Sequence, residues 1–126
     1  MLLVTNNGKV RDRFGDLCTL RFVEGDHGDV LQAVRDLVHR GHKLLTHPLA
    51  GSVKPNETPY RSVALTEQAG TLDLESLQLI EGALATYAKF KPRAGRGMDA
   101  SPSMKEDFAE IDLRLIAGAI EPHLDI

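Results

Sequence analysis

The feature that most constrains the fold is an amphipathic segment, residues 26–40, between two short apolar runs. Its apolar residues recur at helical spacing: Val30, Leu31, Val34, Leu37 and Val38. This pattern predicts a helix with one buried face. Asp26 can cap its start, and Gly41 suits the left-handed position that follows a helix end. Because residues 17–23 and 43–46 are typical of strands, we expect a parallel, right-handed βαβ unit.

The rest of the chain predicts two more strands and two more helices. Residues 1–5 are typical of a strand buried on both faces, and residues 61–66 predict a fourth strand. Residues 8–16 are charged and irregular, with one weak helical turn at most. Residues 73–90 predict a second helix that ends before a proline. Residues 92–102, rich in Gly, Pro, Ser and Arg, predict a flexible linker before the last helix.

Two start signals compete for that last helix. Ser103 with Glu106 forms a capping box, whereas Ser101 precedes a proline at the first helical position. The face we expect to be buried consists of Phe108, Ile111, Leu115 and Ala119. We therefore predict one α/β domain over residues 1–126: three α/β/α layers, about four mostly parallel strands and three helices.

Composition excludes several classes of function. The 126 residues carry a net charge of −3, which gives no electrostatic reason to bind nucleic acid or an anionic membrane. The single Cys18 excludes an internal disulfide and fits a reducing compartment. No leader-like segment and no apolar run of membrane-spanning length is present, so we expect a cytoplasmic protein.

Polar residues follow each of the first three predicted strands. Ligands of open parallel sheets bind beyond the carboxyl ends of the strands. Asp26 and His27 at one such end form a candidate acid–base pair, and Ser52 with Lys54 could hold an anion. The predicted ligand contacts are Asn6, Asn7, Asp26, His47, Ser52, Lys54, Asn56 and Thr58.

No metal or cofactor is predicted. His39, His42 and His47 lie close in sequence, but Gly41 turns the chain between the first two, and no zinc-binding spacing is present. His47 follows a predicted strand, which makes it the candidate general acid or base. A basic group fits either a phosphate or acidic partner or a solvated flank: Lys89, Lys91, Arg93 and Arg96.

Three stretches carry a resemblance to a known family. They are LLVTNN, FVEGD, and DVLQAVRDLVHRGHKLLTHPLAGSVKPNETPYRSV. Together they resemble the GrdX family, small proteins encoded alongside the glycine, sarcosine and betaine reductases of anaerobic amino-acid fermenters. The resemblance covers most of the chain and is densest over residues 23–63. It implies a cytoplasmic bacterial protein with an accessory role, and glycine reductase components as partners.

Three functions stay open at this point. The leading hypothesis is an accessory protein of amino-acid reductase metabolism that binds a small anionic metabolite. The alternative is a small enzyme acting on a phosphorylated or carboxylated metabolite, with His47 as acid or base and Ser52 and Lys54 on the anion. The third is a structural partner of the reductase complex. A homo-oligomer is compatible with each of them.

Overall fold

A computed structural model describes residues 1–49, 58–90 and 100–124, and its described part contains a three-stranded mixed sheet. The strands are β1 (Leu2–Thr5), β2 (Thr19–Phe22) and β3 (Ser62–Leu65), in the order β2-β1-β3. β1 is parallel to β2 and antiparallel to β3. The α/β class is therefore confirmed, whereas the prediction of a mostly parallel four-stranded sheet is wrong for the described residues.

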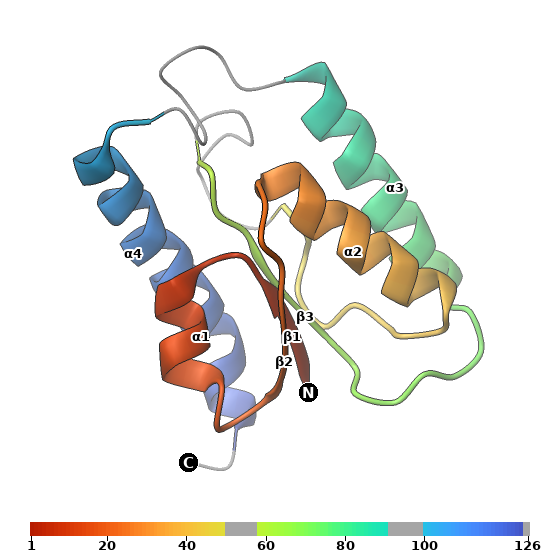
Figure 1. Ribbon diagram of the computed structural model, residues 1–126. Helices are drawn as coiled ribbons and strands as arrows, with labels where there is room; N and C mark the ends of the chain where they lie inside the picture. The colour runs from red at the N-terminus through yellow and green to blue at the C-terminus, as the bar shows by residue number, and fades with distance from the viewer. Residues whose placement is uncertain (50–57, 91–99, 125–126) are drawn as a thin grey trace.

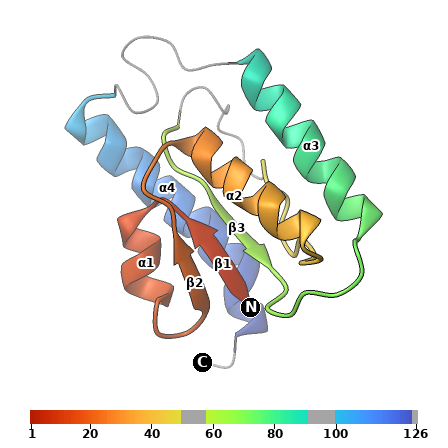
Figure 2. The ribbon, with the colours of Figure 1, turned by 45° about the vertical axis from the view of Figure 1, so that its right-hand side comes forward.

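Helices cover both faces of this sheet (Figures 1 and 2). α2 (His27–His39) and α3 (Leu74–Lys89) lie on one face, and α1 (Gly8–Phe14) and α4 (Pro102–Ile120) lie on the other. Successive residues of a strand point to opposite faces. Accordingly, Leu2 and Val4 of β1 belong to the core under α2 and α3, and Leu3 belongs to the core under α1 and α4. A short 3-10 turn, η2 (Glu121–His123), follows α4.

The amphipathic helix forms as predicted. Asp26 caps α2, with its side chain accepting from the Asp29 amide at 2.9 Å, and Asp29 returns a bond to the Asp26 amide. All five residues of the predicted apolar face are buried. Gly41 has a φ of 108°, and a Cβ there would lie 2.0 Å from the Gly70 carbonyl oxygen. The turn after α2 therefore requires glycine.

The irregular segment predicted at residues 8–16 is instead a helix, so four α-helices rather than three are described. Asn7 caps α1 by accepting from the Lys9 amide at 3.1 Å. Val10 and Phe14, one helical turn apart, are both fully buried. A cap and two buried side chains are enough to stabilise this short helix against the sheet.

The strand predicted at residues 43–46 is reduced to one antiparallel bridge between Leu44 and Leu65. The amides of Leu45 and Thr46 both donate to the Ala64 carbonyl, at 2.8 and 3.3 Å. The Ala64 amide in turn donates to the Thr46 hydroxyl at 3.0 Å. Because a side chain replaces a backbone acceptor, the ladder is interrupted. The predicted βαβ unit is thus wrong in its last strand, and the parallel pair of the sheet is β1 with β2.

The last helix starts at the second of its two competing signals. Ser101 caps α4, accepting from the Met104 amide at 3.3 Å, with Pro102 as the first helical residue. The predicted buried face is wrong, since Ile111 is 41% and Leu115 39% exposed. The residues that α4 buries are Ala109, Asp112, Ile116, Ala117 and Ile120. A carboxylate therefore occupies the middle of the helix face that meets the sheet.

Candidate functional site

The buried amide of Asn6 joins three chain segments at the sheet edge where β1 ends and β3 begins. Its Nδ2 donates to the Gly25 carbonyl at 3.0 Å and to the Pro59 carbonyl at 2.8 Å. Its Oδ1 accepts from the Arg61 amide at 3.0 Å. One side chain thus fixes the approaches to α2 and β3 relative to the end of β1.

Next to it, a chain of buried hydrogen bonds ends on Asp112 of α4. The Asn7 backbone N–H donates to the Thr5 hydroxyl at 3.0 Å. The Thr5 and Ser62 hydroxyls are 2.7 Å apart. The Ser62 hydroxyl donates to Asp112 Oδ2 at 2.8 Å, and Asn7 Nδ2 donates to the same oxygen at 3.0 Å. If Thr5 donates to Ser62, every one of these groups has a consistent role. The network holds the carboxylate in one orientation.

Asp112 and Arg61 are opposite charges removed from water, 5% and 4% exposed respectively. Burial raises the pKa of the Asp112 carboxyl, although hydrogen bonds from Asn7 and Ser62 and the charge of Arg61 act against this. Burial also lowers the pKa of the Arg61 guanidinium, and Asp112 opposes that shift. A guanidinium nevertheless keeps its proton in proteins. The cavity lining therefore contains a permanent cation and a carboxyl whose pKa burial raises.

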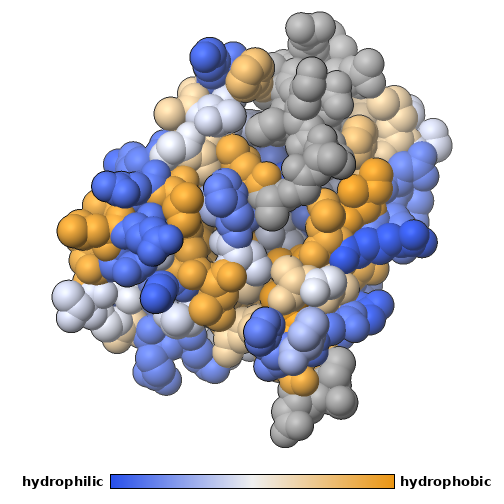
Figure 3. Space-filling view, turned by 180° about the vertical axis from the view of Figure 1, so that it is seen from behind, coloured by the Kyte–Doolittle hydropathy of each residue, from blue (hydrophilic) through white to orange (hydrophobic). Residues whose placement is uncertain are grey.

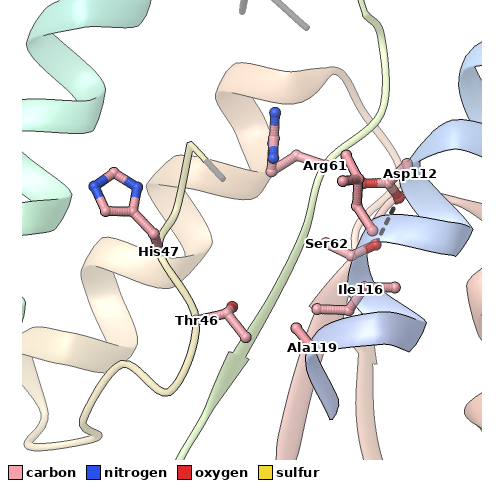
Figure 4. Close-up of a pocket in the computed structure, with 8 residues that line it drawn as sticks. Thr46, His47, Arg61, Ser62, Asp112, Ile116 and Ala119 are labelled. Atoms are coloured by element: carbon pink, nitrogen blue, oxygen red, sulfur yellow. Dashed lines mark hydrogen bonds between the residues drawn. The ribbon is translucent and has the colours of Figure 1, made fainter. Parts of the chain in front are cut away.

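A cavity of about 50 Å³ is open beside these two side chains. Its lining consists of Thr46, His47, Arg61, Ser62, Asp112, Leu115, Ile116 and Ala119. In Figure 4 the Arg61 side chain extends away from Asp112, which faces Ser62. Residues of α4 contribute an apolar wall. The cavity thus combines two opposite charges at different points with a hydrophobic side.

Four of the predicted ligand residues use their polar atoms within the fold. Asn6 and Asn7 bind the groups described above, and Asp26 caps α2. The Thr58 hydroxyl donates to the Tyr60 carbonyl at 3.3 Å and accepts from the Tyr60 amide at 3.2 Å. These contacts shape the loops around the cavity. Three further predicted ligand residues lie outside the described residues: Ser52, Lys54 and Asn56.

The two histidines near the site differ in environment. His27 is 1% exposed, 3.4 Å from the Thr58 carbonyl through Nδ1, and packed on Tyr87. Burial and the nearby charge of Arg61 lower the pKa of His27 from 6.5 to about 3, so its imidazole is neutral at neutral pH. His47 is exposed, and its Nδ1 accepts from the Leu49 amide at 3.0 Å. Its ring points away from Ser62 and Asp112 (Figure 4).

Sequence reasoning missed the three polar residues that line the cavity most directly: Arg61, Ser62 and Asp112. A signal for Asp112 was present, since it lies three residues after Ala109 and four before Ile116, on one helical face. Arg61 directly precedes β3 and Ser62 opens it, and the other residues of β3 are apolar. A polar residue within an apolar face indicates a buried hydrogen-bond network.

Across residues 1–49, 58–90 and 100–124, no group of three or more His, Cys, Asp or Glu side chains is placed to hold a metal ion. Over the same ranges, no helix has the length and apolar character needed to cross a membrane.

Comparison with known proteins identifies one family. The sequence matches the model of the family described as GrdX-like protein over residues 2–121 of the 126-residue chain. No curated protein and no solved structure matches it. Because the family match covers nearly the whole chain, including every strand and α-helix described above, this protein belongs to the GrdX-like family.

Proposed function

We propose that this GrdX-like protein is an accessory component of a glycine reductase system that binds a small anionic metabolite in the cavity beside Arg61. Membership of the family indicates an association with glycine reductase systems. One observation supports an anionic ligand: the buried guanidinium of Arg61 lines the cavity. The cavity lies where β1 ends, the edge at which α/β proteins commonly bind their ligands.

The chemistry of arginine supports an anion as the ligand. A guanidinium presents five N–H donors in a planar fork, so it can bind a carboxylate with two donors while others serve the protein. Its burial leaves little water to screen an incoming negative charge. The cavity volume of about 50 Å³ suits a group of a few non-hydrogen atoms.

Titration with acetate and with inorganic phosphate tests this proposal. We expect saturable shifts of the backbone NMR signals of residues 46, 61 and 112 with at least one of the two anions. Arg61→Gln should weaken binding about tenfold or more, because a charged hydrogen-bond donor is lost. Arg21→Gln, the same change at an exposed arginine of β2, is the matched control and should bind as the unaltered protein does.

Two results would overturn the proposal. One is the absence of saturable shifts with both anions at neutral pH. The other is unchanged affinity in Arg61→Gln, provided its thermal unfolding remains cooperative. Arg61→Lys keeps the charge and removes the fork, so it should bind with intermediate affinity if the guanidinium itself recognises the anion.

A second candidate function is a structural partner of the reductase. Its support is the apolar face that α4 turns outward at Ile111 and Leu115. Seen from behind, apolar side chains lie among polar ones on both flanks of the molecule (Figure 3). Retention of purified reductase components on the immobilised protein should fall when Ile111, which does not line the cavity beside Arg61, is changed to serine. Leu74→Ser, at an exposed leucine of α3, should not change retention, and equal retention by all three proteins would exclude this face.

The enzyme alternative remains a prediction with less support. The candidate base His47 is exposed, and its ring nitrogen is engaged by the Leu49 amide. If the protein only binds its ligand, His47→Ala should leave anion affinity within about twofold, since the His47 ring points away from Ser62 and Asp112 and its Nδ1 is engaged by the Leu49 amide. A turnover of a carboxylated or phosphorylated metabolite that His47→Ala abolishes would reverse this order of preference.

A further inference from the structure

The cavity beside Arg61 contains a second charge, the carboxylate of Asp112, that an anion alone does not use. From this pairing we infer that the ligand class is a small zwitterion, with its carboxylate on Arg61 and its ammonium group on Asp112. The inference rests on the proposed anion site and adds a requirement for a positive group on the same molecule. Three features of the described residues support it.

The first feature is electrostatic. A simple anion on Arg61 would share one small cavity with the carboxylate of Asp112. Two negative groups in a buried site repel, unless one takes a proton. A ligand with a positive group beside its carboxylate removes this repulsion and gives Asp112 a charged partner. Each buried protein charge then faces the opposite charge of the ligand.

The second feature is the hydrogen bonding of Asp112. Its Oδ2 accepts from two neutral donors, Asn7 Nδ2 at 3.0 Å and Ser62 Oγ at 2.8 Å. A backbone hydrogen bond from Ser62 also reaches this carboxylate. An ionised carboxylate offers about four acceptor positions, so capacity is left for an ammonium donor. The neutral donors hold the carboxylate in place without cancelling its charge. Asn7 itself is fixed by its bond to the Ala109 carbonyl at 2.8 Å.

The third feature is the arrangement of the lining. The Arg61 side chain extends away from the Asp112 carboxylate, so the two charges occupy separate parts of the cavity (Figure 4). Leu115, Ile116 and Ala119 form an apolar wall suited to methylene or methyl groups. With a volume of about 50 Å³, the cavity favours the shortest compounds that carry both charges.

Three probes of similar size test the inference. Glycine carries both charges, acetate only the carboxylate, and ethylamine only the ammonium group. At neutral pH we expect glycine to bind about tenfold more tightly than acetate, the gain of one charged hydrogen bond, and ethylamine to bind weakest. This comparison uses the unaltered protein, so it does not depend on the folding of a variant.

Variants of Asp112 sharpen the test. Asp112→Asn should weaken the binding of glycine about tenfold, because the partner of its ammonium group is lost. The affinity for acetate should stay the same or rise, because the repelling charge is gone. Asp107→Asn, at an exposed acid of the same helix, is the matched control and should keep the preference for glycine. Equal affinities for glycine and acetate, both lost in Arg61→Gln, would overturn the zwitterion inference and keep the anion site. Failure of glycine and both test anions to bind would overturn both proposals.

Discussion

The helices α2 and α4, which pack on opposite faces of the sheet, bury different kinds of face. α2 buries an apolar stripe, and its polar residues lie at its ends or toward solvent. α4 buries a carboxylate among small and branched apolar residues and leaves Ile111 and Leu115 exposed. α2 thus stabilises the sheet, whereas α4 brings Asp112 to the cavity.

Hydrogen bonds determine the orientation of α4. With its more apolar face inward, α4 would bury Leu115 and leave Asp112 in water, and Asn7 would lose a buried acceptor. Unpaired buried donors cost about 1–3 kcal/mol each, comparable to the gain from burying one leucine. The free energy of the hydrogen-bond network from Thr5 to Asp112 is therefore comparable to that of burying one more apolar side chain of α4.

Truncating one leucine on each helix should affect the free energy of unfolding very differently. Leu31→Ala on α2 should lower the free energy of unfolding by about 2–5 kcal/mol, because it removes a fully buried side chain from the core. Leu115→Ala on α4 should lower it by much less, about 1 kcal/mol at most, since that side chain is 39% exposed and belongs to neither hydrophobic core cluster. Urea denaturation measures both. Equal losses would show that the outward face of α4 is also part of the core.

The pH dependence of stability should carry opposite signs for the two helices. The pKa of His27, on α2, is lowered from 6.5 to about 3, so the folded state binds fewer protons and stability falls as pH falls through this window. The pKa of Asp112, on α4, is raised above 3.8, so the folded state binds more protons. Its contribution is therefore greatest below pH 3.8 and is lost as pH rises through the raised value.

Two variants separate these slopes. His27→Phe should flatten the fall in stability between pH 6.5 and about 3, which amounts to a few kcal/mol. Asp112→Asn should remove the opposing contribution of Asp112, so that stability falls more steeply as the pH is lowered over this range. Denaturant midpoints across this range give the measurement. An unchanged slope in His27→Phe would mean that other groups control acid sensitivity.

A glycine within α4 should allow a small gain in stability. Gly118 lies in the last turns of α4, and a Cβ there would meet no atom within 4 Å. Gly118→Ala should therefore raise stability by about 0.5–1 kcal/mol through helix propensity. Gly41→Ala after α2 is the contrasting change and should destabilise, because it combines a positive φ with a clash. A loss of stability in Gly118→Ala would indicate that α4 needs a flexible end.

Sequence patterns predicted the parts of this protein that depend on local chemistry. The cap at Asp26, the apolar face of α2 and the glycine turn after it follow from propensity and spacing, as does the family resemblance, which is confirmed. The buried face of α4 and the cavity were missed because they depend on partners about 50 and 105 residues away, Ser62 and Asn7. A local pattern contains no information about such partners.

The three bonds of Asn6 have a consequence for how the protein folds. Its partners lie 19, 53 and 55 positions along the chain, at Gly25, Pro59 and Arg61. β1, α1 and β2 can associate early, since they occupy the first 22 residues, but β3 has to close a long loop before it pairs. The Asn6 contacts therefore form late, and the cavity exists only in the completed fold. A ligand bound there would slow unfolding of the native state and would not assist its early intermediates.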